Sequence, residues 1–197
     1  MPALYFDATS QQFLSLTKVP GTFGAVVAVA TRTLDPGTGP ASGWDAITGI
    51  GSTQANTGPY NKMTGFFLRY WGPTAAPEFV VGITNNTNYI SVVDGSANPA
   101  VYMPKNRAAV WAGQARDKIA ELYINGKKLV SNTASANFKN ADGPGAIGAA
   151  YADNASTSFF FTGYIAEVAI FKKPLTSADL GSIHRALLSK YRIDDFK

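Results

Sequence analysis

The sequence contains no cysteine and a single histidine among its 197 residues. Without cysteine the chain forms no disulfide, zinc finger, iron–sulfur centre or thiol nucleophile. Because His184 is the one histidine, a two-histidine metal site is not possible, and a Ser-His-Asp triad would have to use His184 itself. His184 lies beside the apolar stripe of a predicted closing helix, so we expect an ordinary helix-edge histidine.

Paired carboxylates are also scarce. A glycosidase needs two carboxyl groups on one face of a strand, which requires acidic residues two or four positions apart. Glu78 and Glu167 have no acidic partner at either spacing. We therefore expect no enzymatic activity, with a glycosidase or lyase as the least favoured alternative.

Charged residues make up 15% of the chain, and the net charge is +4. The first hundred residues carry four Lys/Arg and five Asp/Glu, whereas the rest carry thirteen and eight, so the excess is near +5 in the second half. This asymmetry fits a basic face for an acidic partner or an ordinary solvated surface. The basic residues form no nucleic-acid signature, and we expect no nucleic-acid partner.

Long apolar runs are missing as well. The first residues lack the basic stretch and apolar core of a signal peptide, and no 18-residue apolar span occurs. We expect no export signal and no membrane span.

Many short β-rich runs separated by glycine and proline are present instead. With 46% hydrophobic residues, 19 glycines and 11 prolines, the composition predicts an all-β single domain over residues 1–197. Residues 23–31 are β-branched and nearly unbroken, which is typical of a central strand covered on both faces. The other predicted strands are 3–6, 12–16, 65–71, 78–83, 89–93, 108–115, 119–125 and 159–171.

Asn125-Gly126 is the strongest local signal. Asn-Gly between alternating apolar residues predicts a type I′ hairpin. That register sets Leu122 opposite Leu129 and Tyr123 opposite Lys128.

A short amphipathic helix is predicted near the C-terminus. Thr176 is a suitable N-cap with Asp179 three residues later, and Leu175 and Leu180 have the spacing of a hydrophobic staple. The predicted apolar stripe consists of Leu180, Ile183, Leu187, Leu188 and Tyr191.

These segments resemble a laminin G-like domain of the concanavalin A-like lectin/glucanase superfamily. The resemblance lies in Leu122-Tyr-Ile-Asn-Gly126, the strand Phe161-Thr-Gly-Tyr-Ile-Ala-Glu-Val-Ala-Ile-Phe171 and the following Pro174-Leu-Thr-Ser-Ala-Asp179. It implies a two-sheet antiparallel jelly-roll sandwich with a short C-terminal helix, on which only some members build enzymes. The Glu-x-Asp-x-x-Glu pattern of the superfamily's glycosidases is missing here.

Members of the family often hold calcium at the sandwich rim or edge. Here the acidic pair usual in the closing strand is reduced to Ala166-Glu167, which removes one carboxylate. Asp153 and Asn154 remain as candidate metal ligands, since calcium prefers carboxylate and amide oxygens. Both are also ordinary turn residues. No cofactor is certain, and calcium is the one candidate.

Three aromatic residues lie beside Gly/Pro loops, where exposed rings are expected: Trp44, Tyr60 and Trp71. A flat ring covers the apolar face of a sugar, so these three are the candidate ligand-binding residues, against the alternative that they simply pack. Trp111 and Phe159–Phe161 lie within predicted strands and are assigned to the core.

Two binding functions remain. The first is a non-enzymatic structural, decoration or adhesin component of a larger particle such as a phage virion, located on a virion or extracellular surface. Its partners would be capsid or tail proteins, cell-surface glycans or further copies of the chain. The alternative is a soluble lectin-like carbohydrate-binding module.

Overall fold

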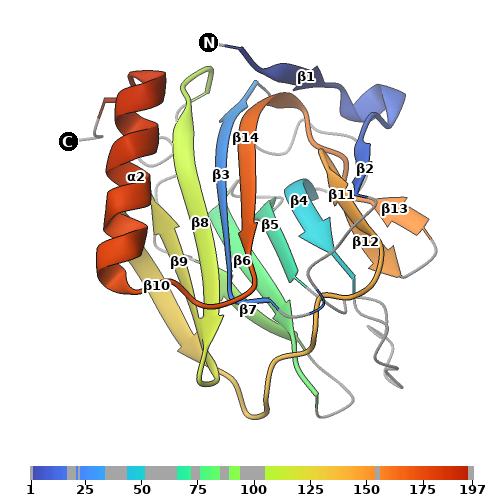
Figure 1. Cartoon of the computed structure of the whole chain (residues 1–197). Coiled ribbons are helices and arrows are strands. Elements are labelled where there is room, and N and C mark those ends of the chain that lie inside the picture. The colour runs from blue at the N-terminus through green and yellow to red at the C-terminus, as the bar shows by residue number, and fades with distance from the viewer. Residues whose placement is uncertain are drawn as a thin grey trace.

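The fold was analysed in a computed structural model. The structure describes residues 2–16, 21, 23–33, 44–51, 66–71, 76–84, 89–93, 105–153 and 156–194. Two antiparallel sheets face each other, and an α-helix near the C-terminus lies against one of them (Figure 1). The predicted jelly-roll sandwich with a C-terminal helix is therefore confirmed.

The first sheet has six strands in the order β1 (Leu4–Phe6), β14 (Gly163–Phe171), β3 (Ala25–Arg32), β8 (Ala109–Arg116), β9 (Ile119–Ile124) and β10 (Lys127–Thr133). The second has the order β2 (Leu14–Leu16), β11 (Gly145–Ile147), β4 (Trp44–Ile50), β5 (Phe66–Trp71), β6 (Ala76–Gly82) and β7 (Tyr89–Val93). A small hairpin of β12 (Ala150–Asp153) and β13 (Ser156–Ser158), one 3₁₀ turn η1 (Ala8–Ser10) and the helix α2 (Ser177–Tyr191) complete the described elements.

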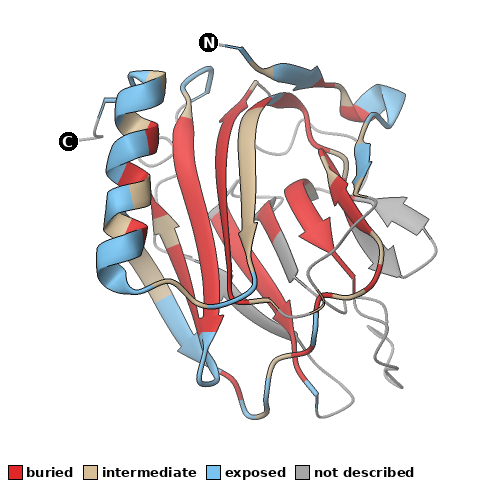
Figure 2. Cartoon of the chain, in the orientation of Figure 1, coloured by how far each residue is buried: buried red, intermediate tan, exposed pale blue. Residues whose placement is uncertain are grey.

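Strand β3 is covered on both faces, as its continuous apolar sequence predicts. All eight of its residues are buried (Figure 2). Val26 and Ala28 point into the core between the sheets, whereas Val27 and Val29 contact the cluster beneath α2. This alternation follows from the two-residue period of a strand.

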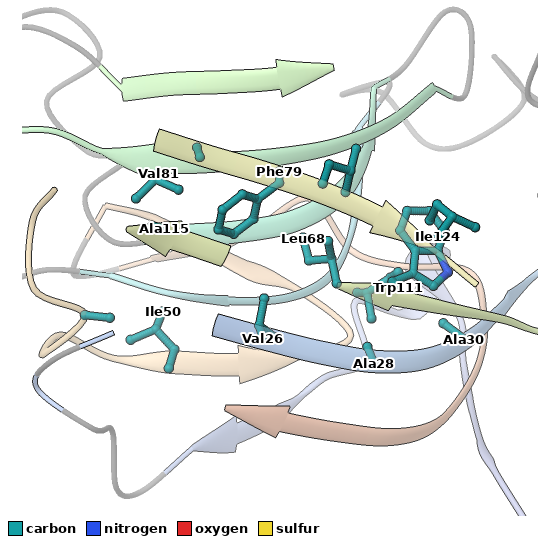
Figure 3. Packing of buried hydrophobic residues seen from close by; sticks show 14 of the residues in the cluster. Val26, Ala28, Ala30, Ile50, Leu68, Phe79, Val81, Trp111, Ala115 and Ile124 are labelled. Carbon is teal, nitrogen blue, oxygen red and sulfur yellow. The ribbon is translucent and has the colours of Figure 1, made fainter. Parts of the chain in front are cut away.

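The core between the sheets is built from apolar side chains that both sheets contribute. Phe79 and Leu68 of the second sheet meet Trp111 and Val26 of the first (Figure 3). Gly113 leaves the space for Phe79, since a Cβ atom on Gly113 would lie 2.2 Å from Phe79 Cδ2. Trp111 and Phe161 are fully buried, which confirms their assignment to the core.

The Asn125-Gly126 turn joins β9 to β10 as predicted. Both residues have positive φ, 48° for Asn125 and 84° for Gly126, which the type I′ turn requires. Tyr123 pairs with Lys128 as expected, but Leu122 pairs with Val130 and not with Leu129. The predicted pairing fails because a β-bulge after Lys128 inserts one extra residue into β10.

The cap of helix α2 is also confirmed. Thr176 Oγ1 accepts a hydrogen bond from the Asp179 N–H at 3.1 Å and donates one to Asp179 Oδ2 at 2.6 Å. Leu175 and Leu180 both join the cluster between the helix and the first sheet. The helix-edge expectation for His184 is wrong, because His184 is 1% exposed and lies within the buried face of the helix. Within the described ranges no helix combines the length and apolar character needed to cross a membrane.

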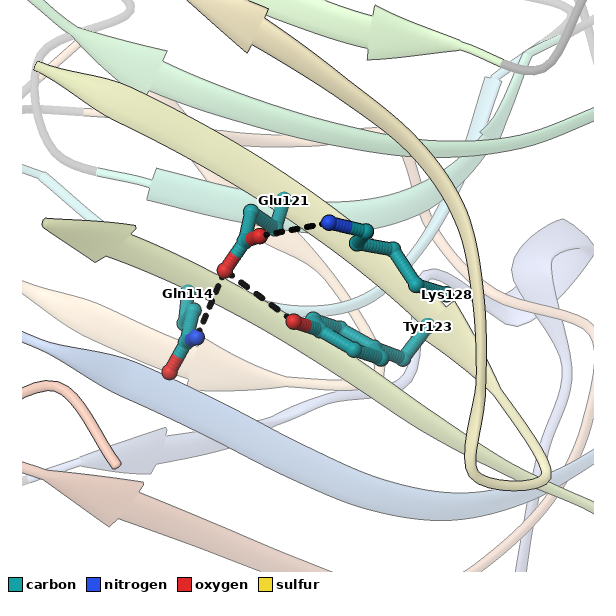
Figure 4. A network of polar contacts seen from close by, with 4 residues as sticks. All are labelled: Gln114, Glu121, Tyr123 and Lys128. Carbon is teal, nitrogen blue, oxygen red and sulfur yellow. Dashed lines mark hydrogen bonds and ion pairs between the residues drawn. The ribbon is translucent and has the colours of Figure 1, made fainter. Parts of the chain in front are cut away.

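A polar network joins strands β8, β9 and β10 of the first sheet (Figure 4), and one of its members also bonds to the segment that leads into α2. Glu121 Oε2 accepts hydrogen bonds from Gln114 Nε2 at 2.7 Å and Tyr123 OH at 3.0 Å, and Oε1 lies 3.3 Å from Lys128 Nζ. Gln114 Oε1 in turn accepts a bond from the Leu175 N–H at 3.2 Å. Burial alone would raise the pKa of Glu121, but these donors lower it below its ordinary value.

Two glycine-to-alanine changes are expected to alter stability in opposite directions. Gly113→Ala should lower the free energy of unfolding by about 1–3 kcal/mol, because the new methyl group overlaps Phe79. Gly181→Ala, in the helix interior with only Arg185 Nη1 nearby, should raise it by about 0.5–1 kcal/mol. Urea denaturation measures both values, and equal effects would contradict this account of the core.

Candidate functional site

The register of β4, β5 and β6 brings sequence-distant residues together. Trp44 is the Cα partner of Trp71, and two residues further along Ala46 is the partner of Arg69. Arg69 is in turn the partner of Glu78 on β6. Directly opposite residues occupy the same face of a sheet, so the two tryptophan positions and this charged pair share one face.

That face is the one turned away from the core. Leu68 and Phe79 pack in the core and are Cα partners, so the adjacent positions Arg69 and Glu78 belong to the opposite face by strand alternation. Of the two faces of the second sheet, the outer one thus carries the candidate site.

Arg69 and Glu78 form a buried ion pair on this outer face. Arg69 Nε lies 2.6 Å from Glu78 Oε2, and the two side chains are 2% and 3% exposed. Removing both charges from water is costly and is offset only by close, hydrogen-bonded geometry, which this pair has. Replacement of one partner alone would leave a buried charge without its counter-ion.

Phe159 covers the guanidinium. Arg69 Cζ lies 5.2 Å from the centroid of the Phe159 ring, within the range of a cation–π contact. The Phe159 carbonyl accepts a hydrogen bond of 2.7 Å from the Ala46 N–H, which fixes this segment beside β4. Phe159 has a φ of 60°, a left-handed conformation that is uncommon for a bulky side chain and stores strain of about 1–3 kcal/mol.

Asp45 is a titratable group between Trp44 and Ala46 in β4, and strand alternation places it on the opposite face from those two residues. Its backbone pairs with Tyr70, and its side chain is half-buried. Burial raises the pKa of the Asp45 carboxyl to about 6. At neutral pH this group is mostly an anion that accepts hydrogen bonds, and it becomes a donor in mild acid.

The structure brings together two of the three predicted ligand-binding residues. Trp44 and Trp71 begin β4 and end β5 as a register pair, although sequence analysis had placed them only beside loops. Tyr60 lies outside the described residues.

The two predicted calcium ligands are located only in part. Asp153 ends β12, whereas Asn154 lies outside the described residues. Over the ranges that the structure describes, no three His, Asp or Glu side chains gather closely enough to hold a metal ion. Calcium binding by Asp153 and Asn154 stays a prediction.

Sequence reasoning missed Arg69, Glu78 and Phe159 as parts of one site. A signal was present, because Arg69 and Glu78 each stand in an otherwise apolar strand, where an isolated charge needs a partner. The approach of Phe159 carried no local signal, since it comes from a segment some eighty residues away.

A concavity lies at the N-terminal edge of the sandwich, away from the Arg69–Glu78 pair. It is an apolar slot of about 450 Å³ between the edge strands of the two sheets. Leu4 and Leu14 line it from either side and remain 57% and 45% exposed, and Tyr5 and Tyr164 form an exposed aromatic pair nearby, with ring centroids 5.0 Å apart. The slot is lined by Pro2, Ala3, Leu4, Phe6, Leu14, Ile147, Ile165, Ala166, Glu167 and Val168.

Solved structures share this fold at low sequence identity. The carbohydrate-binding module CBM40 of a Ruminococcus gnavus sialidase, bound to α2,3-sialyllactose, matches with a TM-score of 0.58 and 13% identity over 88% of this chain and 92% of the module. A putative carbohydrate-binding protein of Bacteroides ovatus matches with a TM-score of 0.56 and 15% identity over 86% of this chain. The receptor-binding domain of botulinum neurotoxin D matches with a TM-score of 0.60 and 16% identity over 89% of this chain.

The match spans 43% of the Bacteroides protein chain and 41% of the neurotoxin chain, which is less than half of each. No curated protein sequence matches this chain. A family model described as the concanavalin A-like lectin/glucanases superfamily matches residues 21–181, most of the chain. The two sheets, their antiparallel order and this match together place the chain in the concanavalin A-like lectin/glucanase superfamily.

Proposed function

We propose that this domain binds a carbohydrate on the outer face of its second sheet. The observation that carries the proposal is the register that sets Trp44 opposite Trp71, two residues from the buried Arg69–Glu78 pair. The Ruminococcus module, whose structure holds a sialylated sugar, and the Bacteroides protein supply independent support from the same fold.

The chemistry of these residue types suits a sugar. Indole rings cover the apolar face of a pyranose, and a few fixed polar groups then orient its hydroxyls. The Arg69–Glu78 pair, two residues further along the same face, supplies a fixed polar group beside the tryptophan positions. A preorganised site loses less side-chain entropy on binding, which favours affinity for a weakly interacting ligand such as a sugar.

Binding without catalysis is part of the proposal. Each of the three glutamates is engaged by a structural partner: Glu78 by Arg69, Glu121 by Lys128 and Glu167 by Lys190. A glycosidase needs one carboxyl group as acid and a second as base or nucleophile. Asp45 alone, with its raised pKa, supplies only one of these roles.

A second candidate function is that of a component of a larger assembly, such as the surface of a phage virion. The observation that favours it is the apolar slot with its exposed neighbours Leu4, Tyr5, Leu14 and Tyr164. Exposed apolar groups that gather at one edge are typical of contact surfaces. The two functions are compatible, because the slot and the tryptophan pair lie in different parts of the sandwich.

Trp71→Ala is expected to weaken glycan binding at least tenfold without unfolding the domain, since a lost stacking ring removes about 1.4 kcal/mol or more of binding energy. A glycan array with calcium and with a chelator identifies the ligand, and calorimetry then compares the variants. Tyr164→Ala, an exposed aromatic on the first sheet, is the matched control. Equal affinity of Trp71→Ala and the parent protein for a verified ligand would remove Trp71 from the site.

The buried ion pair should support the site through its position. Arg69→Met alone and Glu78→Leu alone should each lower the free energy of unfolding by about 3–5 kcal/mol, because each leaves one buried charge without its counter-ion. The double variant should recover much of this loss and still bind glycan less tightly. Additive losses in a double-mutant cycle of denaturation midpoints would show that the pair does not act as a unit.

The assembly candidate predicts self-association through the slot. Sedimentation velocity should show a mass that grows with protein concentration. The double variant Leu4→Lys/Leu14→Lys should abolish this growth, because contact between copies would bury two unpaired charges. Ile119→Lys, at an exposed residue on β9, is the control. A monomer at all concentrations would contradict assembly between copies of this chain.

A further inference from the structure

His184 occupies an unusual place in the contact between α2 and the first sheet. It lies one helical turn from Leu180 and from Leu187, and all three residues are buried. His184 is 1% exposed, less than either leucine. The buried face of the helix thus contains one ionisable side chain among apolar ones.

The imidazole has no polar partner in the part of the chain that the structure describes. Neither Nδ1 nor Nε2 makes a hydrogen bond, and the same holds for the buried Nδ2 of Asn125. The helix approaches the β9–β10 turn so closely that a Cβ atom on Gly126 would lie 3.7 Å from His184 Nδ1. The Tyr123 ring lies 6.3 Å from the imidazole, centroid to centroid.

The groups around His184 offer no charge to compensate a proton. Strands β3 and β8 present Val27, Val29, Val110 and Ala112 to the helix. On β9 the titratable groups are Tyr123 and Glu121, and on β10 it is Lys128, which is already bound to Glu121. Burial raises the pKa of the Tyr123 hydroxyl to about 12, so this group stays neutral. On α2 itself the neighbouring Arg185 bonds to Ser182.

We propose that His184 makes the docking of α2 on the first sheet sensitive to acid, so that protonation of its imidazole releases the helix. Release uncovers the apolar outer face formed by Val27, Val29, Val110 and Ala112. A charged imidazole is strongly disfavoured between these side chains, because no partner replaces the water that it loses.

The direction and size of the effect follow from proton linkage. Burial lowers the pKa of His184 to about 4 from its ordinary 6.5. Docking is therefore fully favourable above pH 6.5 and weakens about tenfold for each pH unit below it, until the docked imidazole also takes up a proton near pH 4. Between pH 7 and pH 5 the docking equilibrium should weaken roughly 25-fold.

Three carboxyl groups also titrate in acid, but their effects on stability differ from that of His184. Glu121 and Glu167, which hold the two ends of α2, have lowered pKa values, so their contribution is lost only as the pH falls below their ordinary value of 4.5. Asp45 on the second sheet has a raised pKa, so its titration favours the folded state as the pH falls from 6 towards 3.8. Between pH 7 and pH 5, His184 is therefore the group whose titration weakens the docking of α2. The titration of Asp45 over the same range stabilises the folded state instead.

The first test is a proton NMR titration of the imidazole Hε1 resonance, which needs no assignment because His184 is the only histidine. In parallel, hydrogen exchange of residues 177–191 and 25–32 is compared at pH 7 and pH 5 after correction for intrinsic rates. We expect no imidazole titration centred near pH 6.5 in the docked state. We also expect α2 protection to fall about 25-fold while β3 protection is retained.

His184→Leu should remove the pH dependence of α2 protection, and Arg185→Ala, an exposed change on the same helix, should preserve it. Circular dichroism at pH 7 establishes whether His184→Leu folds, and the titration of the parent protein stands independently of that variant. A docked imidazole that titrates near pH 6.5 would overturn the proposal. So would α2 protection that falls equally in the parent and in His184→Leu.

Discussion

The burial of β3 on both faces is the constraint on which the rest of this molecule depends. Its inward residues are covered by the second sheet and its outward valines by α2. A strand with eight buried residues would otherwise expose an apolar face to water, at a cost of roughly 25 cal/mol for each Å². The closing helix is therefore an integral part of the core, and the Gln114 bond to the Leu175 N–H positions its start.

This constraint assigns different tasks to the two outer faces. On the outer face of the first sheet, α2 covers the outward residues of β3 and β8. The outer face of the second sheet instead carries Arg69 and Glu78, covered by Phe159 in a strained backbone conformation. Apolar residues of similar volume would be at least as stable as a buried ion pair, so stability alone gives no reason for the pair. A requirement to hold charge and aromatic rings in fixed positions does give one, and it is the reasoning behind the proposed carbohydrate site.

Much of the fold was predictable because its signals are local. The β-branched run of β3, the Asn125-Gly126 turn and the cap at Thr176 each act within a few residues. The pairing of Leu122 was not predictable, since the bulge in β10 depends on how the two strands twist against each other. Strands β4, β12 and β13 escaped prediction because short runs with glycine or polar residues resemble loops.

The candidate site was predictable only in its residue types. Trp44 and Trp71 stood out as aromatics beside loops, but their pairing is a property of sheet register, which a single sequence does not encode locally. The depth of His184 was mistaken for a similar reason. Its helical position beside the stripe allows either a rim or a buried location, and the close approach of the Gly126 backbone decides between them.

The described part of the chain buries ionisable side chains in two different ways, and the difference has a consequence for function. Arg69 and Glu78 neutralise each other across neighbouring strands, so both keep their charges in place. His184 has no counter-ion and avoids the cost of burial by remaining neutral, as its lowered pKa indicates. The second arrangement responds to pH, because the buried imidazole can take up a proton only by placing its charge among apolar side chains. Strands β4, β5 and β6 pair with one another and lie in the other sheet, so the group that makes helix docking sensitive to acid is separate from the proposed carbohydrate site.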